Sequence, residues 1–305
     1  MNFINVENLS KRFGPFQALK DINFTVAAGG SMAIIGPNGS GKTTLVRCLL
    51  GLLAPSAGRA EIAGLPYDSG HRSCVGYLPE ERGNFQRDTP LEVIRLFGRL
   101  RGLSYREATI QAYDYLDDVA LTAQARSPIQ TLSNGQQQKI HLGVTFIGNP
   151  KLLVLDEPTR GFDPINQAIF KTHLQRQLRE GTTLILVTNQ MHEVEELTDN
   201  VLFLRKGNQH FAGELENAKQ MLGGRRTVLT YTGELPESAR KWNIDVQATG
   251  VAVMDSPHEV GSAKELLGQL VSDGVQITDF STRLSSMDEI FVAVYGESGQ
   301  FGNLD

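Results

Sequence analysis

The sequence predicts an α/β fold whose core is a mostly parallel sheet covered by helices on both faces. Apolar runs at residues 32–35, 152–155 and 184–187 are typical of buried strands, and segments with a helical period separate them. Polar motifs follow the carboxyl ends of these strands, which is where ligands bind in such sheets. From about residue 223 a pattern of short strands and helices starts again, which indicates a small C-terminal α+β domain.

Two further segments complete the predicted first domain, residues 1–222. Short apolar strands at 3–6, 22–26 and 59–62, with a turn-rich stretch at 11–15, predict an antiparallel β subdomain. A helical insertion is predicted after it.

The insertion spans about residues 89–148. Thr89 with Glu92, and Ser104 with Glu107, have the spacing of the capping box that begins a helix. Apolar residues then recur at helical spacing. Its arginines, Arg95, Arg99, Arg101 and Arg106, predict a solvated polar face.

A phosphate-binding loop lies between the first core strand and the helix that follows it. Residues 36–43 read Gly-Pro-Asn-Gly-Ser-Gly-Lys-Thr, which matches G-x-x-x-x-G-K-[ST] in its strand–loop–helix setting. The glycines let backbone N–H groups point at phosphate oxygens, Lys42 adds a charge, and the Thr43 hydroxyl is placed to bind Mg²⁺. The residues predicted to bind a nucleoside triphosphate are Gly36, Pro37, Asn38, Gly39, Ser40, Gly41, Lys42, Thr43 and Thr44.

Composition narrows the classes of protein further. The chain has 305 residues, 40% of them hydrophobic, and a net charge of −5, as expected for an ordinary soluble globular protein. No apolar run approaches the roughly 18 residues of a membrane span, and the N-terminus has no secretion-signal pattern. Cys48 and Cys74 match no metal or disulfide spacing. Residues 226–305 hold 5 Lys and Arg against 12 Asp and Glu, which argues against nucleic acid as a partner.

Two further motifs select among phosphate-loop proteins. Residues 132–136, Leu-Ser-Asn-Gly-Gln, lie at the start of a predicted helix, and the pair Asp156 and Glu157 ends a core strand. With the phosphate loop, these segments make roughly residues 1–220 resemble the ATP-binding-cassette (ABC) ATPase family. The family signature is L-S-G-G-Q, and here Asn134 replaces its first glycine.

The resemblance implies how the motifs act. Ser133, Asn134, Gly135 and Gln136 would contact the γ-phosphate held by the phosphate loop of a second subunit. ATP and Mg²⁺ are therefore the implied cofactors, and the implied assembly is a head-to-tail homodimer.

The resemblance also assigns individual roles. Asp156 would bind Mg²⁺, and Glu157 would orient and deprotonate the attacking water, whose positioning phosphoryl transfer needs most. Asp163 lies in the family's loop that crosses the dimer. Phe13 stands where the family places an aromatic ring against adenine, and Phe16 is the alternative.

Two positions depart from the family pattern. Glu80 replaces the usual glutamine of the segment Gly-Tyr-Leu-Pro-Gln, so a carboxylate stands where an amide would approach Mg²⁺ and the γ-phosphate. Asn189 replaces the switch histidine, and an amide cannot become cationic or carry a proton. We therefore expect slow hydrolysis with ATP binding preserved. His192 is a less favoured substitute, because we expect it on an exposed helix face.

The resulting interpretation is the ATP-binding subunit of a transporter. The stretch Pro-Glu-Glu-Arg-Gly at 79–83 and the final Ser-x-x-Glu-Ile-Phe resemble ATPases of bacterial ABC-2 type exporters. The implied partner is an integral-membrane permease, and the implied location is cytoplasmic, on the inner face of the plasma membrane. The C-terminal domain, residues 223–305, is interpreted as a regulatory or docking module, or as a stabilising one. The alternatives are a nucleotide-gated switch with little turnover and a nucleic-acid-associated cassette ATPase.

Overall fold

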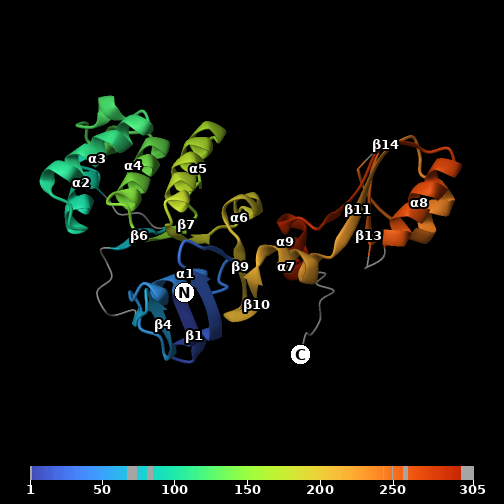
Figure 1. Ribbon diagram of the computed structural model, residues 1–305, viewed down its shortest axis with the longest axis horizontal. Coiled ribbons are helices and arrows are strands. Elements are labelled where there is room, and N and C mark those ends of the chain that lie inside the picture. The colour runs from blue at the N-terminus through green and yellow to red at the C-terminus, as the bar shows by residue number, and fades with distance from the viewer. Residues whose placement is uncertain are drawn as a thin grey trace. The chain divides into compact units, whose positions relative to one another are not determined.

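The computed structural model describes residues 2–66, 74–80, 85–242, 244–248, 250–256 and 260–296 (Figure 1). It divides into two compact units, Met1–Gly213 and Glu214–Asp305, and each has its own sheet. This division falls before the predicted boundary at residue 222. Three residues of the stretch 79–83, Glu81, Arg82 and Gly83, lie outside the described residues.

A mixed ten-stranded sheet organises the first unit. Its order is β5-β4-β1-β2-β10-β9-β3-β8-β7-β6. The parallel part consists of β3 (Ser31–Ile35), β6 (Val75–Leu78), β7 (Leu152–Asp156), β8 (Thr183–Val187) and β9 (Asn200–Arg205). All residues of β3, β7 and β8 are buried, as expected for strands covered on both faces. The predicted parallel core is confirmed.

The other part of this sheet contains the antiparallel strands. They are β1 (Asn2–Phe13), β2 (Phe16–Ala27), β4 (Ala57–Ile62) and β5 (Leu65–Pro66), and β10 (Asn208–Glu214) runs parallel to β2. The turn expected at 11–15 is shorter than predicted. Phe13 pairs with Phe16 across Gly14, whose φ of +56° suits glycine in a tight turn.

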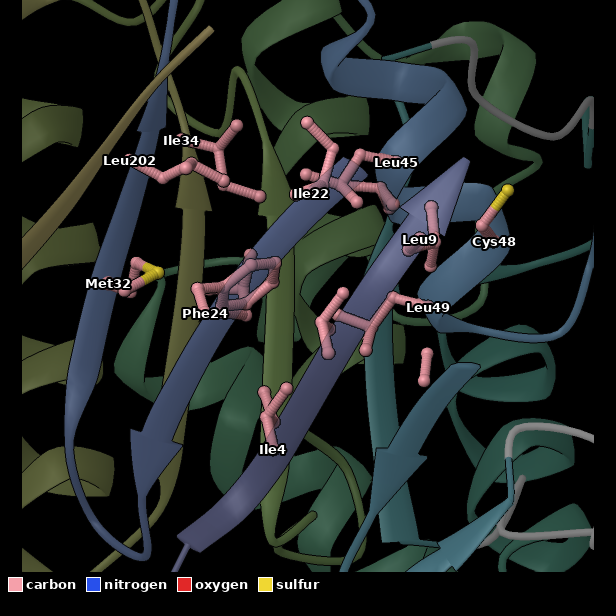
Figure 2. Packing of buried hydrophobic residues seen from close by; sticks show 14 of the residues in the cluster. Ile4, Leu9, Ile22, Phe24, Met32, Ile34, Leu45, Cys48, Leu49 and Leu202 are labelled. Atoms are coloured by element: carbon pink, nitrogen blue, oxygen red, sulfur yellow. The ribbon is translucent and has the colours of Figure 1, made fainter. Parts of the chain in front are cut away.

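Helix α1 (Lys42–Leu49) joins the two parts of the sheet. Its buried face, which includes Leu45, Cys48 and Leu49, packs against apolar residues of β1, β2 and β3 (Figure 2). Ile4 and Leu9 of β1 belong to the same cluster. This packing fixes the start of α1, which carries the end of the phosphate loop.

The insertion is helical, as predicted. It contains α2 (Pro90–Leu100), α3 (Tyr105–Asp118) and α4 (Asn134–Phe146), with the short 3-10 helices η2 (Thr122–Gln124) and η3 (Ile129–Thr131). Both predicted capping boxes are present, and Ser133 with Gln136 forms a third.

One arginine of the insertion, Arg101, is half-buried. Arg101 donates hydrogen bonds to the carbonyls of Val144, Thr145 and Ile147 at the end of α4, and to Val75 of β6. Burial lowers the pKa of Arg101 to about 10. The prediction of a solvated polar face was therefore wrong at this position, because the carbonyls left unpaired at a helix end attract a cation.

Two helices follow the strands that carry the carboxylates and the switch residue. Helix α5 (Pro164–Arg179) comes after β7, and α6 (Met191–Leu197) comes after β8. Asp163 caps α5 by accepting a hydrogen bond from the Asn166 N–H at 2.8 Å.

The second unit has a four-stranded antiparallel sheet in the order β12-β13-β11-β14. Its elements are α7 (Leu215–Ala218), the π-helix η4 (Lys219–Gly223), β11 (Arg225–Thr232), η5 (Glu237–Trp242), β12 (Ile244–Ala248), β13 (Val251–Ser256), α8 (Val260–Ser272), β14 (Gln276–Leu284) and α9 (Met287–Tyr295). Helix α8 lies beside this sheet (Figure 1), and its Leu266 and Leu270 pack with Leu229 and Tyr231 of β11. None of the helices in the described part of the chain is both long and apolar enough to cross a membrane.

Candidate nucleotide-binding site

The phosphate loop is held by close contacts that a larger side chain would break. A Cβ atom on Gly36 would lie 2.4 Å from the Leu204 carbonyl oxygen and 2.6 Å from the Ser40 hydroxyl. Gly41 begins α1 with a φ of +108°, a conformation that favours glycine. The loop therefore needs glycine at both positions for steric reasons in this chain.

Lys42 lies folded inside this loop. Its Nζ donates to the carbonyls of Gly36 at 2.6 Å and of Pro37 at 3.2 Å. Burial lowers the pKa of Lys42, and the carboxylates of Glu157 and Asp156 act in the opposite direction. A bound phosphate would therefore take the place of these two carbonyl oxygens as the hydrogen-bond acceptor of the Lys42 ammonium.

An open pocket of about 620 Å³ adjoins the loop. Its lining combines residues of the phosphate loop with residues that follow β6, β7 and β8. The lining residues are Phe16, Ala18, Asn38, Gly39, Ser40, Gly41, Lys42, Thr43, Thr44, Glu80, Asp156, Glu157, Arg160 and Asn189. Most of the residues predicted from separate motifs are therefore neighbours around one cavity.

Asp156 is the more buried of the two carboxylates, with 2% of its surface exposed. Its Oδ2 accepts no hydrogen bond within the described residues. Burial raises the pKa of Asp156 to about 6, and the nearby charges of Glu80 and Glu157 add to the shift. A cation beside Oδ2 would offset both the burial and the missing hydrogen bond.

Glu157 is held by the backbone of the neighbouring strand. Its N–H donates to the Val187 carbonyl at 2.8 Å, and its Oε1 accepts the Asn189 N–H at 3.0 Å. Its φ of +48° is uncommon for a residue with a side chain. Burial raises the pKa of Glu157, while the bond from Asn189 and the charge of Lys42 lower it.

The donor set fits Mg²⁺ only together with a nucleotide. No group of three or more His, Cys, Asp or Glu side chains in the described ranges is arranged to hold a metal. The pocket offers a metal only a few oxygen ligands, from Asp156, Glu80 and the Thr43 hydroxyl. This suits Mg²⁺, which usually keeps waters and takes its remaining ligands from phosphates.

Glu80 lies in an ion pair that the sequence did not reveal. Nη1 of Arg160 lies 2.8 Å from its Oε1. Arg160 also lines the pocket, so a second cation accompanies Lys42 there. The added carboxylate at position 80 is therefore matched by an added positive charge.

Asn189, the residue at the predicted switch position, lies at the pocket. Asn189 is exposed and lines the pocket, and its backbone contacts Glu157. His192 is exposed on α6 and does not line the pocket.

The signature residues lie away from the pocket lining. The Ser133 hydroxyl accepts from the Gln136 N–H at 3.3 Å, and the Ser133 N–H donates to the Gln136 side chain at 2.9 Å. Ser133 and Asn134 are exposed, and a Cβ atom on Gly135 would lie 3.9 Å from Nδ2 of Asn166 in the first turn of α5. None of Ser133, Asn134, Gly135, Gln136 and Asp163 lines the pocket.

The two phenylalanines differ in their positions. Phe16 is exposed and lines the pocket, whereas Phe13 does not line it and has the Lys11 ammonium 5.1 Å from its ring centre. The alternative aromatic residue therefore has the better position for stacking on a base.

Sequence reasoning missed three polar residues beside the site: Arg160, Thr159 and Glu193. Thr159 and Arg160 come directly after Glu157 and Pro158, so proximity to the carboxylates was an available signal. Glu193 is fully buried four residues after Asn189 and accepts hydrogen bonds from Thr159 and Thr188. Its burial has no signal in the sequence.

The chain resembles known proteins over most of its length. The family described as ABC transporter matches residues 19–160. An uncharacterized ABC transporter ATP-binding protein of Methanocaldococcus jannaschii is 37% identical over 215 residues, which is 70% of this chain and 78% of that protein. The daunorubicin resistance ATP-binding protein DrrA3 of Streptomyces coeruleorubidus is 31% identical over 308 residues, 96% of each chain.

A solved structure agrees with these relatives. The ATP-binding subunit of an ABC transporter superposes with a TM-score of 0.68 at 28% identity, covering 72% of this chain and 92% of the other. Sequence, fold and pocket lead to one conclusion: the chain belongs to the ABC transporter family, as an ATP-binding subunit that energises transport.

Proposed function

We propose that this subunit hydrolyses Mg-ATP slowly, at two sites formed between the subunits of a head-to-tail homodimer, and so drives an exporter permease. The observation that carries the proposal is the separation of the motifs. The phosphate loop, Asp156 and Glu157 share one pocket, while the signature helix begins elsewhere on the surface. A second copy placing its Ser133 against the pocket would complete the site, because an exposed helix start presents free N–H groups to anions.

Each residue of the pocket has a distinct task in this proposal. Lys42 and the loop N–H groups bind the phosphates, and Glu157 accepts the proton of the attacking water. Asp156, Thr43 and Glu80 would hold Mg²⁺, which supplies positive charge to the β- and γ-phosphates when bound. The Asn189 side chain would donate a hydrogen bond to the γ-phosphate, without the charge of a histidine.

Slow turnover follows from the switch position. One lost contact to a transition-state oxygen costs about 2.7–4 kcal/mol, roughly a hundredfold or more in rate. A nucleotide-gated switch with little turnover is the second candidate, and Asn189 with the Glu80–Arg160 pair favours it.

The exporter assignment rests on relatives. A protein whose name states daunorubicin resistance aligns with 96% of this chain, and the alignment therefore includes the second unit. Removing a toxic compound from the cell requires a permease, and the described helices of this chain include none that could span a membrane. The proposed location is the cytoplasmic face of the membrane that holds the permease.

The test is ATP-driven dimerisation of Glu157→Gln. With Mg-ATP this variant should form a stable dimer in light scattering, because binding persists while the base is lost. Adding Lys42→Ala should return it to a monomer, which controls for nucleotide dependence. A Glu157→Gln chain that stays monomeric with Mg-ATP, even with its permease, would contradict the proposal.

A further inference from the structure

Glu193 is a buried acid with no assigned task. It lies in the first turn of α6, and its surface is 0% exposed. One of its oxygens, Oε1, accepts a hydrogen bond from the Thr159 hydroxyl, and Oε2 accepts from the Thr188 hydroxyl at 2.9 Å. No ion pair between described residues includes Glu193, so its stabilisation comes from the two hydroxyls.

The two threonines belong to the two segments that carry the reaction. Thr159 lies two residues after Glu157, in the segment that leads to Asp163. Thr188 directly follows β8 and precedes Asn189. Gln190 closes the arrangement, since its side-chain N–H₂ donates to the Thr159 hydroxyl at 2.8 Å and its backbone N–H donates to the Thr188 hydroxyl at 3.0 Å.

This ring of contacts reaches Glu157 through one backbone amide. Asn189 lies between Thr188 and Gln190, both of which the ring holds. The Asn189 N–H donates to Oε1 of Glu157 at 3.0 Å. The direction of the Glu157 carboxylate therefore depends on a peptide that Glu193 anchors.

We propose that Glu193 is a positioning residue for Glu157. Through Thr188 and the Asn189 amide it fixes the orientation of the Glu157 carboxylate. Through Thr159 it also connects that carboxylate to the segment leading to Asp163. The inference rests on the proposed hydrolysis by Glu157 and adds a residue that does not touch the nucleotide. A buried acid without a cation is costly, and an apolar side chain would fill the same space at lower cost. What the acid provides is two acceptors that join both segments.

The variant Glu193→Gln tests this role because it keeps the shape and removes one acceptor. An amide N–H₂ cannot accept a hydrogen bond, so one threonine hydroxyl loses the acceptor to which it donates. We expect kcat to fall at least about tenfold, since small misplacements of a reacting group have large effects on rate. We expect KM for ATP and ATP-driven dimerisation to change less than about threefold, because the phosphate loop is untouched.

The threonines supply matched variants. Thr188→Val and Thr159→Val should each lower kcat, and Thr188→Ser should restore the turnover that Thr188→Val loses, because serine keeps the hydroxyl. Glu195→Gln, exposed on the same helix, is the control. If Glu193→Gln does not fold, the threonine variants decide the question alone.

Amide hydrogen exchange gives a readout that does not need turnover. In Glu193→Gln the peptide containing residues 188–190 should exchange faster than in the Glu195→Gln control, because the Asn189 amide is no longer held. Parental exchange in this peptide, or parental kcat in Glu193→Gln and both valine variants, would overturn the inference. Absence of turnover in the parental chain with its permease would instead contradict the proposed function, and the exchange experiment would still test Glu193.

Discussion

Arg160 and Glu80 form an ion pair at the nucleotide pocket, with Nη1 of the guanidinium 2.8 Å from Oε1 of the carboxylate. Both side chains line the same pocket as Lys42, Asp156 and Glu157. The pocket thus holds three carboxylates and two cations. The positive charge of Arg160 therefore lies directly beside the negative charge of Glu80.

Removing this cation should weaken ATP binding. In Arg160→Met three carboxylates face one lysine, so a polyphosphate meets more repulsion. Both partners are largely exposed, at 67% and 47%, so screening limits the effect to about 1 kcal/mol, or about fivefold in Kd. Titration with a fluorescent ATP analogue measures the change. Glu80→Gln added to Arg160→Met should recover the affinity.

Helix α5, which follows Arg160 in the sequence, offers a matched control. Arg176 pairs with Glu180 at 3.4 Å on α5, outside this pocket. Arg176→Met should leave the Kd for ATP unchanged. An Arg160→Met chain with parental affinity would show that the pair does not balance the charge of the pocket.

The switch position predicts a gain of activity. Asn189→His should raise turnover by at least about tenfold, because an imidazole can donate to the γ-phosphate and also carry a positive charge. The exposed side chain at this position lines the pocket, so histidine can be accommodated there. Steady-state phosphate release with Mg-ATP measures the effect. His192→Ala should not change the rate, and unchanged turnover in Asn189→His would remove the explanation for slow hydrolysis.

The two phenylalanines should contribute unequally to adenine binding. Phe16→Ala should weaken ATP binding about fivefold, since stacking contributes about 1 kcal/mol, while Phe13→Ala should have little effect. Phe16 lines the pocket and Phe13 does not. Competition by inorganic triphosphate separates base from phosphate: neither variant should alter its binding. A larger loss of ATP affinity in Phe13→Ala would reverse the assignment.

Local motifs made much of this fold predictable. The structure of a local motif depends on only a few neighbouring residues, as in the phosphate loop, the capping box at Thr89 and the apolar strand 152–155. Their common placement at one edge of the sheet follows from parallel strands alternating with helices. This placement predicts Lys42 and Asp156 at one edge, the family resemblance adds Asn189, and all three line one pocket.

Contacts between distant segments were not predictable in this way. The Arg160–Glu80 pair joins residues 80 positions apart, and Arg101 binds carbonyls more than 40 positions away. The choice between Phe13 and Phe16 depends on a hairpin turn that is tighter than the turn-rich stretch suggested. Glu193 looks like an ordinary helix residue until its burial is known.

The second unit contains a charge cluster whose stability effect depends on pH. Glu289 is the third residue of α9. Its Oε2 lies 2.7 Å from Nη1 of Arg283, and its Oε1 lies 3.3 Å from Nη1 of Arg226. Burial would raise the pKa of Glu289, but hydrogen bonds from Arg283 and Ser286 and both arginine charges bring it down to about 2. Because the folded pKa lies below that of the unfolded chain, this stabilisation is present above about pH 4.5 and is lost as the pH falls toward about 2.

Glu289→Gln should therefore destabilise the second unit at neutral pH by about 2 kcal/mol and flatten its pH dependence below about pH 4.5. Glutamine can still serve the capping box with Ser286, so the change isolates the charge. The only tryptophan of the chain, Trp242, is partly buried against the core of this unit, so its fluorescence during urea unfolding reports on this unit. Glu265→Gln, exposed on α8, is the control and should unfold as the parental chain does. If Glu289→Gln matched the parental midpoint at both neutral and acid pH, the arginine pairs would contribute nothing to stability, and the depressed pKa would have no consequence for folding.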